Sequence, residues 1–240
     1  MILKVVTWNM GCGPTASPYR KSHSEAWDYL IRELRPDVAL VQEALVTNIE
    51  EARSSHSVVV CDLGPSVTAG TAVLVRELDI NVVPSVAISP HTYTASIEIK
   101  TPVGQLTVVS IHPFPGKELH ADLERLVSLL GTTLVGRSIL VGGDFNVSRR
   151  WDEVYGGKRH RRFFVAMDEV GFYDAHWGTL GHEVQSFWRP GTVESYQNDH
   201  FFITKAWAPH IRTCNVIDNE VVRQLSDHGP VVLGLDISTV

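Results

Sequence analysis

The chain contains the stretch Ile139-Leu140-Val141-Gly142-Gly143-Asp144-Phe145-Asn146. Its apolar start predicts a short buried strand, and the two glycines allow a tight turn at the strand's end. Asp144 and Asn146 stand two positions apart on that turn, so both side chains can point into one site. We therefore expect a strand whose end presents a carboxylate and an amide to a cleft.

The same arrangement, a polar side chain beside the end of an apolar strand, recurs at five other places along the chain. Each case alone fits ordinary turn chemistry: Asn9 can cap a turn, Asp144 can begin an Asx-turn, and Glu43 can lie in solvent. Six recurrences instead favour a shared rim of one fold. The residues expected to converge there are Asn9, Glu43, His112, Asp144, Asn146, Asp199, Asp227 and His228.

The flanking segments predict the rest of the fold. Residues 2–41 read as strand, helix, strand, with a capping box at Ser22 to Glu25 and Pro36 ending the helix. Between Val58 and Ile111 the runs are short and β-branched, which predicts antiparallel strands. Two helices follow, one with leucines spaced along residues 123–134 and one at Phe163–Val170, and the remainder is mostly strand.

This order of elements predicts an α/β fold in one domain spanning residues 1–240. Two mixed, mostly antiparallel sheets would pack face to face with helices outside, making a four-layer α/β sandwich. No repeat, linker or low-complexity segment divides the chain.

Composition excludes several classes of protein. The net charge is -6 and the pI about 6.0, so bulk positive charge does not hold this chain on nucleic acid. No apolar run reaches the ~18 residues of a membrane span. Three dispersed cysteines, Cys12, Cys61 and Cys214, and the absence of a signal peptide favour a cytoplasmic protein. A mature secreted form would look the same, and a monomer is the favoured state.

Six motifs together resemble the endonuclease/exonuclease/phosphatase superfamily, whose members include deoxyribonuclease I-like nucleases, abasic-site endonucleases, sphingomyelinases and inositol polyphosphate 5-phosphatases. The motifs occur in the family's order across residues 7–228. They are Thr7-Trp8-Asn9, Val41-Gln42-Glu43, Ser110-Ile111-His112, Gly143-Asp144-Phe145-Asn146, Asn198-Asp199-His200 and Ser226-Asp227-His228.

The resemblance implies a site that binds Mg2+ or Mn2+. Glu43 would be the main metal ligand, because hard cations select carboxylate oxygen. Asn9 and Asp227 would complete the ligand shell.

The resemblance also assigns catalytic roles. Asp144 would orient or deprotonate the attacking water, and Asn146 would donate a hydrogen bond to phosphate. Asp199 would hold the ring of His228, which would act as general base or as a protonated phosphate ligand. His112 would bind a phosphate oxygen or assist the leaving group.

Two departures from the family pattern concern local packing. Asn198 stands before Asp199, where the family usually has an apolar residue, and the glutamate that pairs with the His112-type histidine in some members has no counterpart in the strands from Thr71 to Ile99. We expect His200 to be structural.

The densest basic stretch lies between the Asp144 turn and the next helix. A positive loop with an aromatic residue suits a polyphosphate backbone, since Arg binds phosphate bidentately and Trp stacks on a base. A solvated loop is the alternative. The candidate substrate residues are Lys117, Arg149, Arg150, Arg159, Arg161 and Trp188, with Trp151 beside them.

The expected activity is that of a divalent-metal-dependent phosphoesterase, most specifically a nuclease that cleaves DNA or RNA. A phosphatase or phosphodiesterase acting on inositol phosphates, phospholipid head groups or another small phosphoester is the first alternative. A catalytically silent binding module is the second.

Overall fold

The structure, a computed structural model, describes residues 1–12, 17–60, 68–82, 92–132, 136–188 and 195–238. The strands of this part of the chain form two six-stranded sheets. In order across the first sheet they are β11 (Ile211–Val216), β12 (Val231–Asp236), β1 (Ile2–Asn9), β2 (Val38–Leu45), β4 (Ala69–Val75) and β3 (Ser57–Val60). In the second they are β5 (Ile80–Val82), β6 (Thr92–Thr101), β7 (Gly104–Pro113), β8 (Ile139–Asp144), β10 (Asp199–Thr204) and β9 (Phe172–Asp174).

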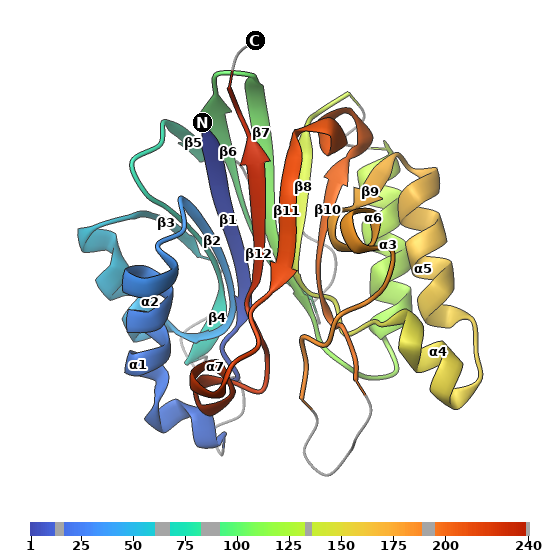
Figure 1. The fold of residues 1–240 in the computed structure, drawn as a ribbon, viewed down its shortest axis with the longest axis horizontal. Coiled ribbons are helices and arrows are strands. Elements are labelled where there is room, and N and C mark those ends of the chain that lie inside the picture. The colour runs from blue at the N-terminus through green and yellow to red at the C-terminus, as the bar shows by residue number, and fades with distance from the viewer. Residues whose placement is uncertain (13–16, 61–67, 83–91, 133–135, 189–194, 239–240) are drawn as a thin grey trace.

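Both sheets are mixed, as predicted. β1 runs parallel to β2, and β7 runs parallel to β8, whereas the other paired strands are antiparallel. The two sheets face each other, and helices cover their outer faces (Figure 1). The predicted four-layer α/β sandwich is therefore confirmed.

Successive side chains on the central strands enter different layers, because a strand points alternate residues to opposite faces. Val5 of β1 and Leu140 of β8 lie in the apolar core between the sheets. The next residues face outward: Val6 packs in a cluster with the first sheet's helices, and Val141 in a cluster with those of the second. This double burial explains why the strands read as nearly continuous apolar runs.

The helices divide between the two outer faces. Over the first sheet lie α1 (His23–Asp28), its π-helical continuation η2 (Tyr29–Leu34), α2 (Val46–Glu51) and α7 (Glu220–Leu225). Over the second lie α3 (Leu119–Thr132), α4 (Arg149–Tyr155) and α5 (Arg159–Glu169), and α6 (Ala175–Leu180) contacts β10 and β11. Short 3-10 turns are η1 (Pro18–Lys21), η3 (Ala52–Ser54) and η4 (Lys205–His210).

Several predicted details differ from the structure. Ser22 is the N-cap of α1 but makes no side-chain capping bond, so the predicted capping box does not form; its hydroxyl instead donates to the Tyr19 carbonyl. The basic stretch predicted as a loop is helical, because Ser148 caps α4 by accepting from the amide of Arg150. α5 consequently begins at Arg159 rather than Phe163. α6 and α7 interrupt the segment predicted to be mostly strand.

Cys12 and Cys214 are buried. Cys61, His91 and part of the strand predicted at Ile80–Ile88 lie outside the described residues. Within the described part, none of the helices combines the length and apolar character that a bilayer crossing requires.

Candidate active site

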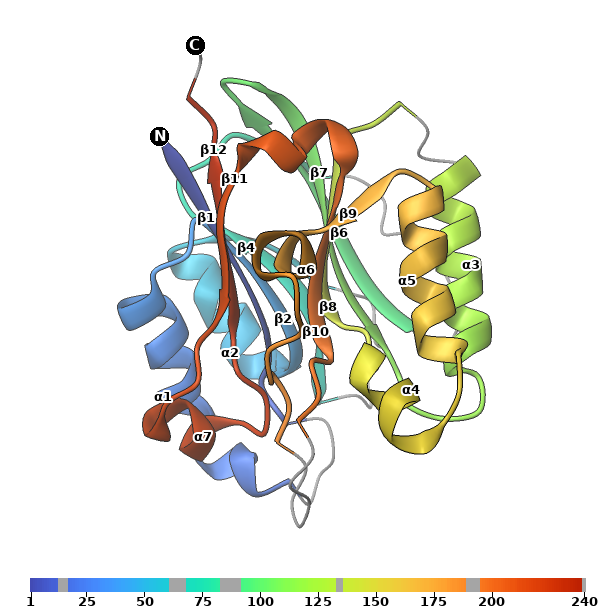
Figure 2. The ribbon, with the colours of Figure 1, turned by 45° about the vertical axis from the view of Figure 1, so that its right-hand side comes forward.

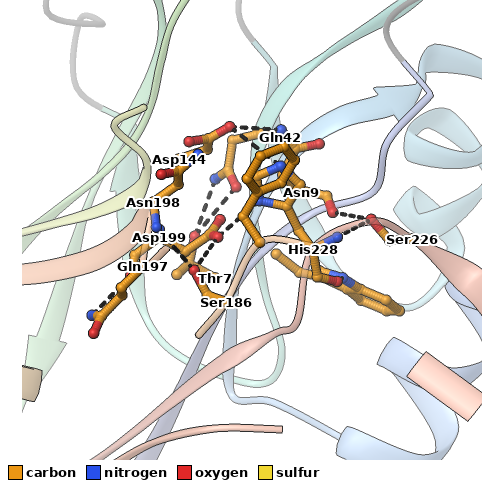
Figure 3. A network of polar contacts seen from close by, with 12 residues as sticks. Thr7, Asn9, Gln42, Asp144, Ser186, Gln197, Asn198, Asp199, Ser226 and His228 are labelled. Atoms are coloured by element: carbon orange, nitrogen blue, oxygen red, sulfur yellow. Dashed lines mark hydrogen bonds and ion pairs between the residues drawn. The ribbon is translucent and has the colours of Figure 1, made fainter. Parts of the chain in front are cut away.

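The predicted polar residues meet at one end of the sandwich, where strands of both sheets terminate. Asn9 ends β1 and Asp144 ends β8, while Asp199 begins the antiparallel β10. Asn9 Nδ2 donates to Asp144 Oδ2 at 3.0 Å, which joins the two sheets by a direct hydrogen bond. Figure 3 shows the polar network that results.

Asp144 occupies the centre of this cluster. Its Oδ2 lies 3.8 Å from His112 Nε2 and 3.8 Å from His228 Nε2, in addition to the bond from Asn9. Only 2% of the residue is exposed. Burial raises the pKa of Asp144, against the opposing effect of the His228 charge. Burial therefore favours the protonated form of this carboxyl group more than water does.

The turn after β8 fixes where Asp144 points. Asp144 Oδ1 accepts from the amide of Asn146 at 2.9 Å, so the Asx-turn considered from the sequence is present together with the site. Gly143 is needed here: its φ is 158°, and an added Cβ would lie 1.9 Å from the Ile111 carbonyl oxygen of the neighbouring β7. Asn146 itself has φ 54° and donates from Nδ2 to the Pro113 carbonyl at 3.0 Å.

His228 is held by a buried carboxylate. Its Nδ1 lies 2.8 Å from Asp199 Oδ2, and the Ser186 hydroxyl donates to the same oxygen at 2.7 Å. Burial alone would lower the pKa of His228, but the charges of Asp199 and Asp144 and the bond to Asp199 raise it to about 10. The ring is thus an imidazolium at neutral pH, with Nε2 directed toward Asp144.

Glu43 projects from an irregularity in β2. The pairing of β2 with β4 shifts register between Val41 and Ala44, and Glu43 takes the left-handed φ of 49°. Its Oε1 lies 3.4 Å from Asn9 Nδ2 and 3.5 Å from His112 Nε2. The Glu43 side chain is 20% exposed, so it borders the solvent side of the cluster.

Asp227 presents a buried oxygen without a hydrogen bond. Among the described residues, none donates to its Oδ1. Burial raises the pKa of Asp227, and the charge of Glu43 adds to the increase. Gly11 lies against this carboxylate, since an added Cβ would be 2.9 Å from Oδ1. A cation beside Asp227 and Glu43 would relieve the cost of burying these charges.

Two sets of residues could hold a divalent cation. Single ligand atoms of Asp144, Asp199 and His228 lie within 4.8 Å of one another. Asp199 Oδ2 already takes two hydrogen bonds, whereas the buried Oδ1 of the same residue has no partner among the described residues. Glu43 and Asp227 are the second set, because they also offer carboxylate oxygens of the kind that Mg2+ and Mn2+ prefer and their charges act on each other.

His112 lies beside both Glu43 and Asp144 in the cluster. It is 1% exposed, and neither ring nitrogen makes a hydrogen bond within the described ranges. No described residue fills the position of the glutamate missing from the sequence motif. The ring of Phe114, 37% exposed, packs 5.1 Å from that of His112.

Some residues of the site carried no sequence signal. Ser186 adjoins no predicted strand, and Phe114 follows the His112 motif without belonging to it. Gln42 and Ser110 did lie within the motifs. They form a buried bond of 2.9 Å between β2 and β7, which links the two sheets directly behind the cluster.

The predicted substrate residues do not gather in one place. The Arg149 guanidinium lies over the rings of Phe164 at 3.6 Å and Trp177 at 4.3 Å, and pairs with Asp174 at 2.9 Å. The Arg149 side chain is held by these packing and ion-pair contacts, which gives no support to a substrate role. Arg150 and Arg161 both pair with Glu153, at 3.3 and 2.9 Å.

Three other predicted residues have different surroundings. Trp188 packs against the outer cluster of the first sheet, with Arg223 over its ring at 5.1 Å. Lys117 is exposed, and Arg159 lines a surface hollow described below. His200 is fully buried and its Nε2 lies 2.9 Å from the Val147 carbonyl, in agreement with a structural role.

Comparisons with known proteins agree with this fold. The model of the Endonuclease/Exonuclease/phosphatase family matches residues 6–228. Among curated proteins, no sequence matches the chain.

Solved structures share the fold at low sequence identity. The endonuclease domain of TRAS1, a telomere-specific non-LTR retrotransposon, superposes with a TM-score of 0.71 at 21% identity and full coverage of both chains. An AP endonuclease from Archaeoglobus fulgidus gives 0.72 at 19%, covering 98% of this chain and 100% of that one. A humanized D. rerio TDP2 gives 0.74 at 14%, covering 98% and 99%.

Proposed function

The chain belongs to the endonuclease/exonuclease/phosphatase family, and on that premise we propose that it hydrolyses phosphodiester bonds of DNA or RNA. The family makes it a phosphoric ester hydrolase that depends on a divalent metal. The single observation that carries the proposal is the meeting of Glu43, Asp144 and His228 around one point, with the spacing given above. Two of the similar structures are endonucleases by name, which supports nucleic acid as the substrate.

In this proposal Glu43 and Asp227 hold Mg2+ or Mn2+, and Asn9 orients Glu43 through its amide. Bound there, the cation would neutralise a non-bridging phosphate oxygen and the charge that develops on the leaving oxygen. The Oδ1 of Asp227, to which no described residue donates, supports this assignment.

Asp144 positions the attacking water and takes its proton at Oδ2. The raised pKa of the buried carboxyl brings its proton affinity closer to that required of a base at neutral pH. Asn9 Nδ2 fixes the oxygen in place, and the Asn146 amide holds the other oxygen in the turn.

His228 supplies positive charge rather than a base. Because Asp199 keeps the ring protonated, its Nε2–H can donate to a phosphate oxygen. Between Asp144 and His228, this division of roles assigns the base to Asp144. Asn146, whose Nδ2 bonds the carbonyl of Pro113 next to His112, and His112 itself would complete the phosphate cradle.

A hydrolysis panel tests the proposal. We expect purified protein to cleave bis-p-nitrophenyl phosphate and a labelled oligonucleotide with Mg2+ or Mn2+, and EDTA to stop both reactions. Glu43→Gln should reduce turnover to background, a loss of at least ~10² in kcat, with the circular dichroism spectrum unchanged. Glu51→Gln, an exposed carboxylate on α2, serves as the matched control and should keep full activity.

Other outcomes of the panel would contradict the proposal. Cleavage of inositol phosphates or another small phosphoester, with nucleic acid left intact, would place the chain among phosphatases. Failure on every substrate would indicate a binding module without catalysis. Wild-type turnover in Glu43→Gln would remove that residue from the metal site.

A further inference from the structure

Two surface hollows beside the second sheet form one continuous groove. The first, about 650 Å³, lies between α3 and α5, and the second, about 520 Å³, lies at the turn from α4 to α5. His120, Arg159 and Arg162 line both hollows, so the two share a wall. Figure 2 shows α3 and α5 side by side with α4 below them. We call this surface the basic groove, defined by His120, Trp151, Tyr155, Lys158, Arg159 and Arg162.

The cations of the basic groove are not neutralised by ion pairs. Within the described part of the chain, Lys158, Arg159 and Arg162 have no carboxylate in ion-pair contact, in contrast to the nearby Arg161. Two acidic residues line its walls. Asp152 accepts from the amide of Arg161 at 2.8 Å, and Glu124 lies toward the α3 end. The groove thus carries net positive charge on a chain whose total charge is -6.

An aromatic wall adjoins these cations. The Trp151 ring stacks on His160 with an interplanar angle of 12° and lies 4.5 Å from the ring of Tyr155. Tyr155 is 54% exposed although it is a large apolar ring. An exposed aromatic beside unpaired cations suits a nucleotide, since bases stack on rings while phosphates meet Lys and Arg.

The basic groove is linked to the catalytic cluster by packed aromatic side chains. Trp151 lies 5.2 Å from the ring of Tyr196, and the Tyr196 backbone pairs with that of Phe187. The Phe187 ring is in turn 4.8 Å from His228. On the other side, the exposed Lys117 stands between the His112 strand end and the start of α3. The aromatic wall of the groove is thus separated from His228 by only two intervening residues, Tyr196 and Phe187.

We propose that the basic groove binds the sugar–phosphate backbone of the substrate strand some nucleotides away from the bond that is cut. This inference rests on the proposed function, which identifies the ligand as a nucleic-acid strand. It predicts that Lys158, Arg159 and Arg162 contact phosphates and that Tyr155 stacks on a base. The same helix presents Arg161 to a different hollow, where it pairs with Glu153 and makes no substrate contact.

Fluorescence anisotropy of a labelled 20-nucleotide oligothymidylate, measured in EDTA, tests the groove without hydrolysis. The triple variant Lys158→Gln, Arg159→Gln, Arg162→Gln should raise Kd at least ~10-fold at low salt. Loss of three phosphate contacts, at about 0.7 per contact for a single strand, should lower the slope of log Kd against log salt by about 2. Its kcat/KM on bis-p-nitrophenyl phosphate should stay within about 2-fold of wild type, because that diester cannot reach the groove.

A second triple variant with the same charge change is the matched control. Lys100, Lys205 and Arg212 lie at the opposite end of the sheets and pair with Asp79, Asp168 and Asp236. Replacing these three by Gln, or Arg161 alone by Gln, should leave Kd near the wild-type value.

Three results would overturn the groove proposal: no oligonucleotide binding by wild type, wild-type Kd and salt slope in the first triple variant, or an equal loss in the control triple. Complete displacement of the oligonucleotide by poly-L-glutamate at equal charge would indicate an acidic protein partner instead. If wild type binds through the groove yet hydrolyses no diester, the proposed function fails while the groove stands.

Discussion

At the scale of single residues, Asp199 has the best-defined hydrogen bonds of the site. One of its oxygens receives hydrogen bonds from both Ser186 and His228, and the residue is completely buried. The carboxylate is therefore locked in orientation and keeps the imidazole of His228 facing Asp144. Such a supporting carboxylate controls both the ring geometry and the proton affinity of a histidine.

Asp199→Asn should lower kcat on bis-p-nitrophenyl phosphate by about 10², because the amide keeps the shape but removes the charge that raises the pKa of His228. The imidazole resonances of His228, followed by NMR against pH, should titrate at lower pH than in wild type. Ser186→Ala, which removes the other bond to the same oxygen, should have a smaller effect on both measurements. A wild-type pKa and kcat in Asp199→Asn would show that Asp199 does not act through His228.

The residues that sequence reasoning identified were those whose position beside an apolar strand made them stand out. Asp144 and His228 belong to this group, and the structure brings them within 3.8 Å. Ser186 was missed because it lies in an irregular segment with no periodic neighbour. Arg149 fitted a substrate contact by its charge alone, but two aromatic rings and Asp174 hold it in packing that no one-dimensional pattern reveals.

At the scale of elements, a neutral histidine links α4 to α5. The amide of Ser148, the N-cap of α4, donates to His160 Nδ1 in the first turn of α5 at 3.0 Å. Burial lowers the pKa of His160 to about 4. Protonation would remove the acceptor, so the contact requires the neutral ring.

The free energy of unfolding should therefore fall as the pH decreases from about 6.5 through about 4. In this window His160 binds a proton in the unfolded chain but not in the folded chain. The stabilisation that comes from the neutral ring is therefore fully present above the unfolded pKa of about 6.5 and is lost as the pH falls through the folded pKa of about 4. His160→Asn keeps an oxygen acceptor but does not titrate. Between pH 7 and pH 4.5 the free energy of unfolding of this variant should fall by less than that of wild type. The difference should be on the order of 1 kcal/mol after allowance for partial solvent screening.

Urea unfolding at pH 7, 5.5 and 4.5 measures this difference. His176, whose pKa burial also lowers to about 4, is present in both proteins and contributes equally to each. Parallel stability curves for wild type and His160→Asn would show that the α4–α5 contact is insensitive to protonation.

Element boundaries were predicted least well where local contacts override the apolar pattern. The sequence predicts a loop where α4 lies, yet the Ser148 cap and the Asp152 carboxylate, which accepts from the α5 amide of Arg161, stabilise α4 and the start of α5. The irregular pairing of β2 at Glu43 was also invisible in sequence, since it depends on register with β4. The central strands were predictable because burial of both faces gives nearly continuous apolar runs.

At the scale of the whole molecule, the basic groove and the catalytic cluster lie at different places on the surface. The chain is acidic overall, the cluster at the strand ends is rich in carboxylates, and three cations without an ion pair among the described residues lie together in the basic groove. This distribution favours a substrate whose backbone is bound in the basic groove and cut at the cluster of carboxylates. A bound cation would offset the negative charge of that cluster. The sandwich architecture was predictable from the order of elements; the groove was not, because α3 and α5 meet only in three dimensions.

The most direct test of the central claim is a crystal structure of the protein soaked in Mn2+, with anomalous scattering used to locate the ion. We expect an anomalous peak about 2.1 Å from a carboxylate oxygen of Glu43, with Asp227 beside it and Asp144 facing it across the cluster. A peak bound by Asp144, Asp199 and His228 with Glu43 uninvolved, or no peak at this end of the sheets, would contradict the account.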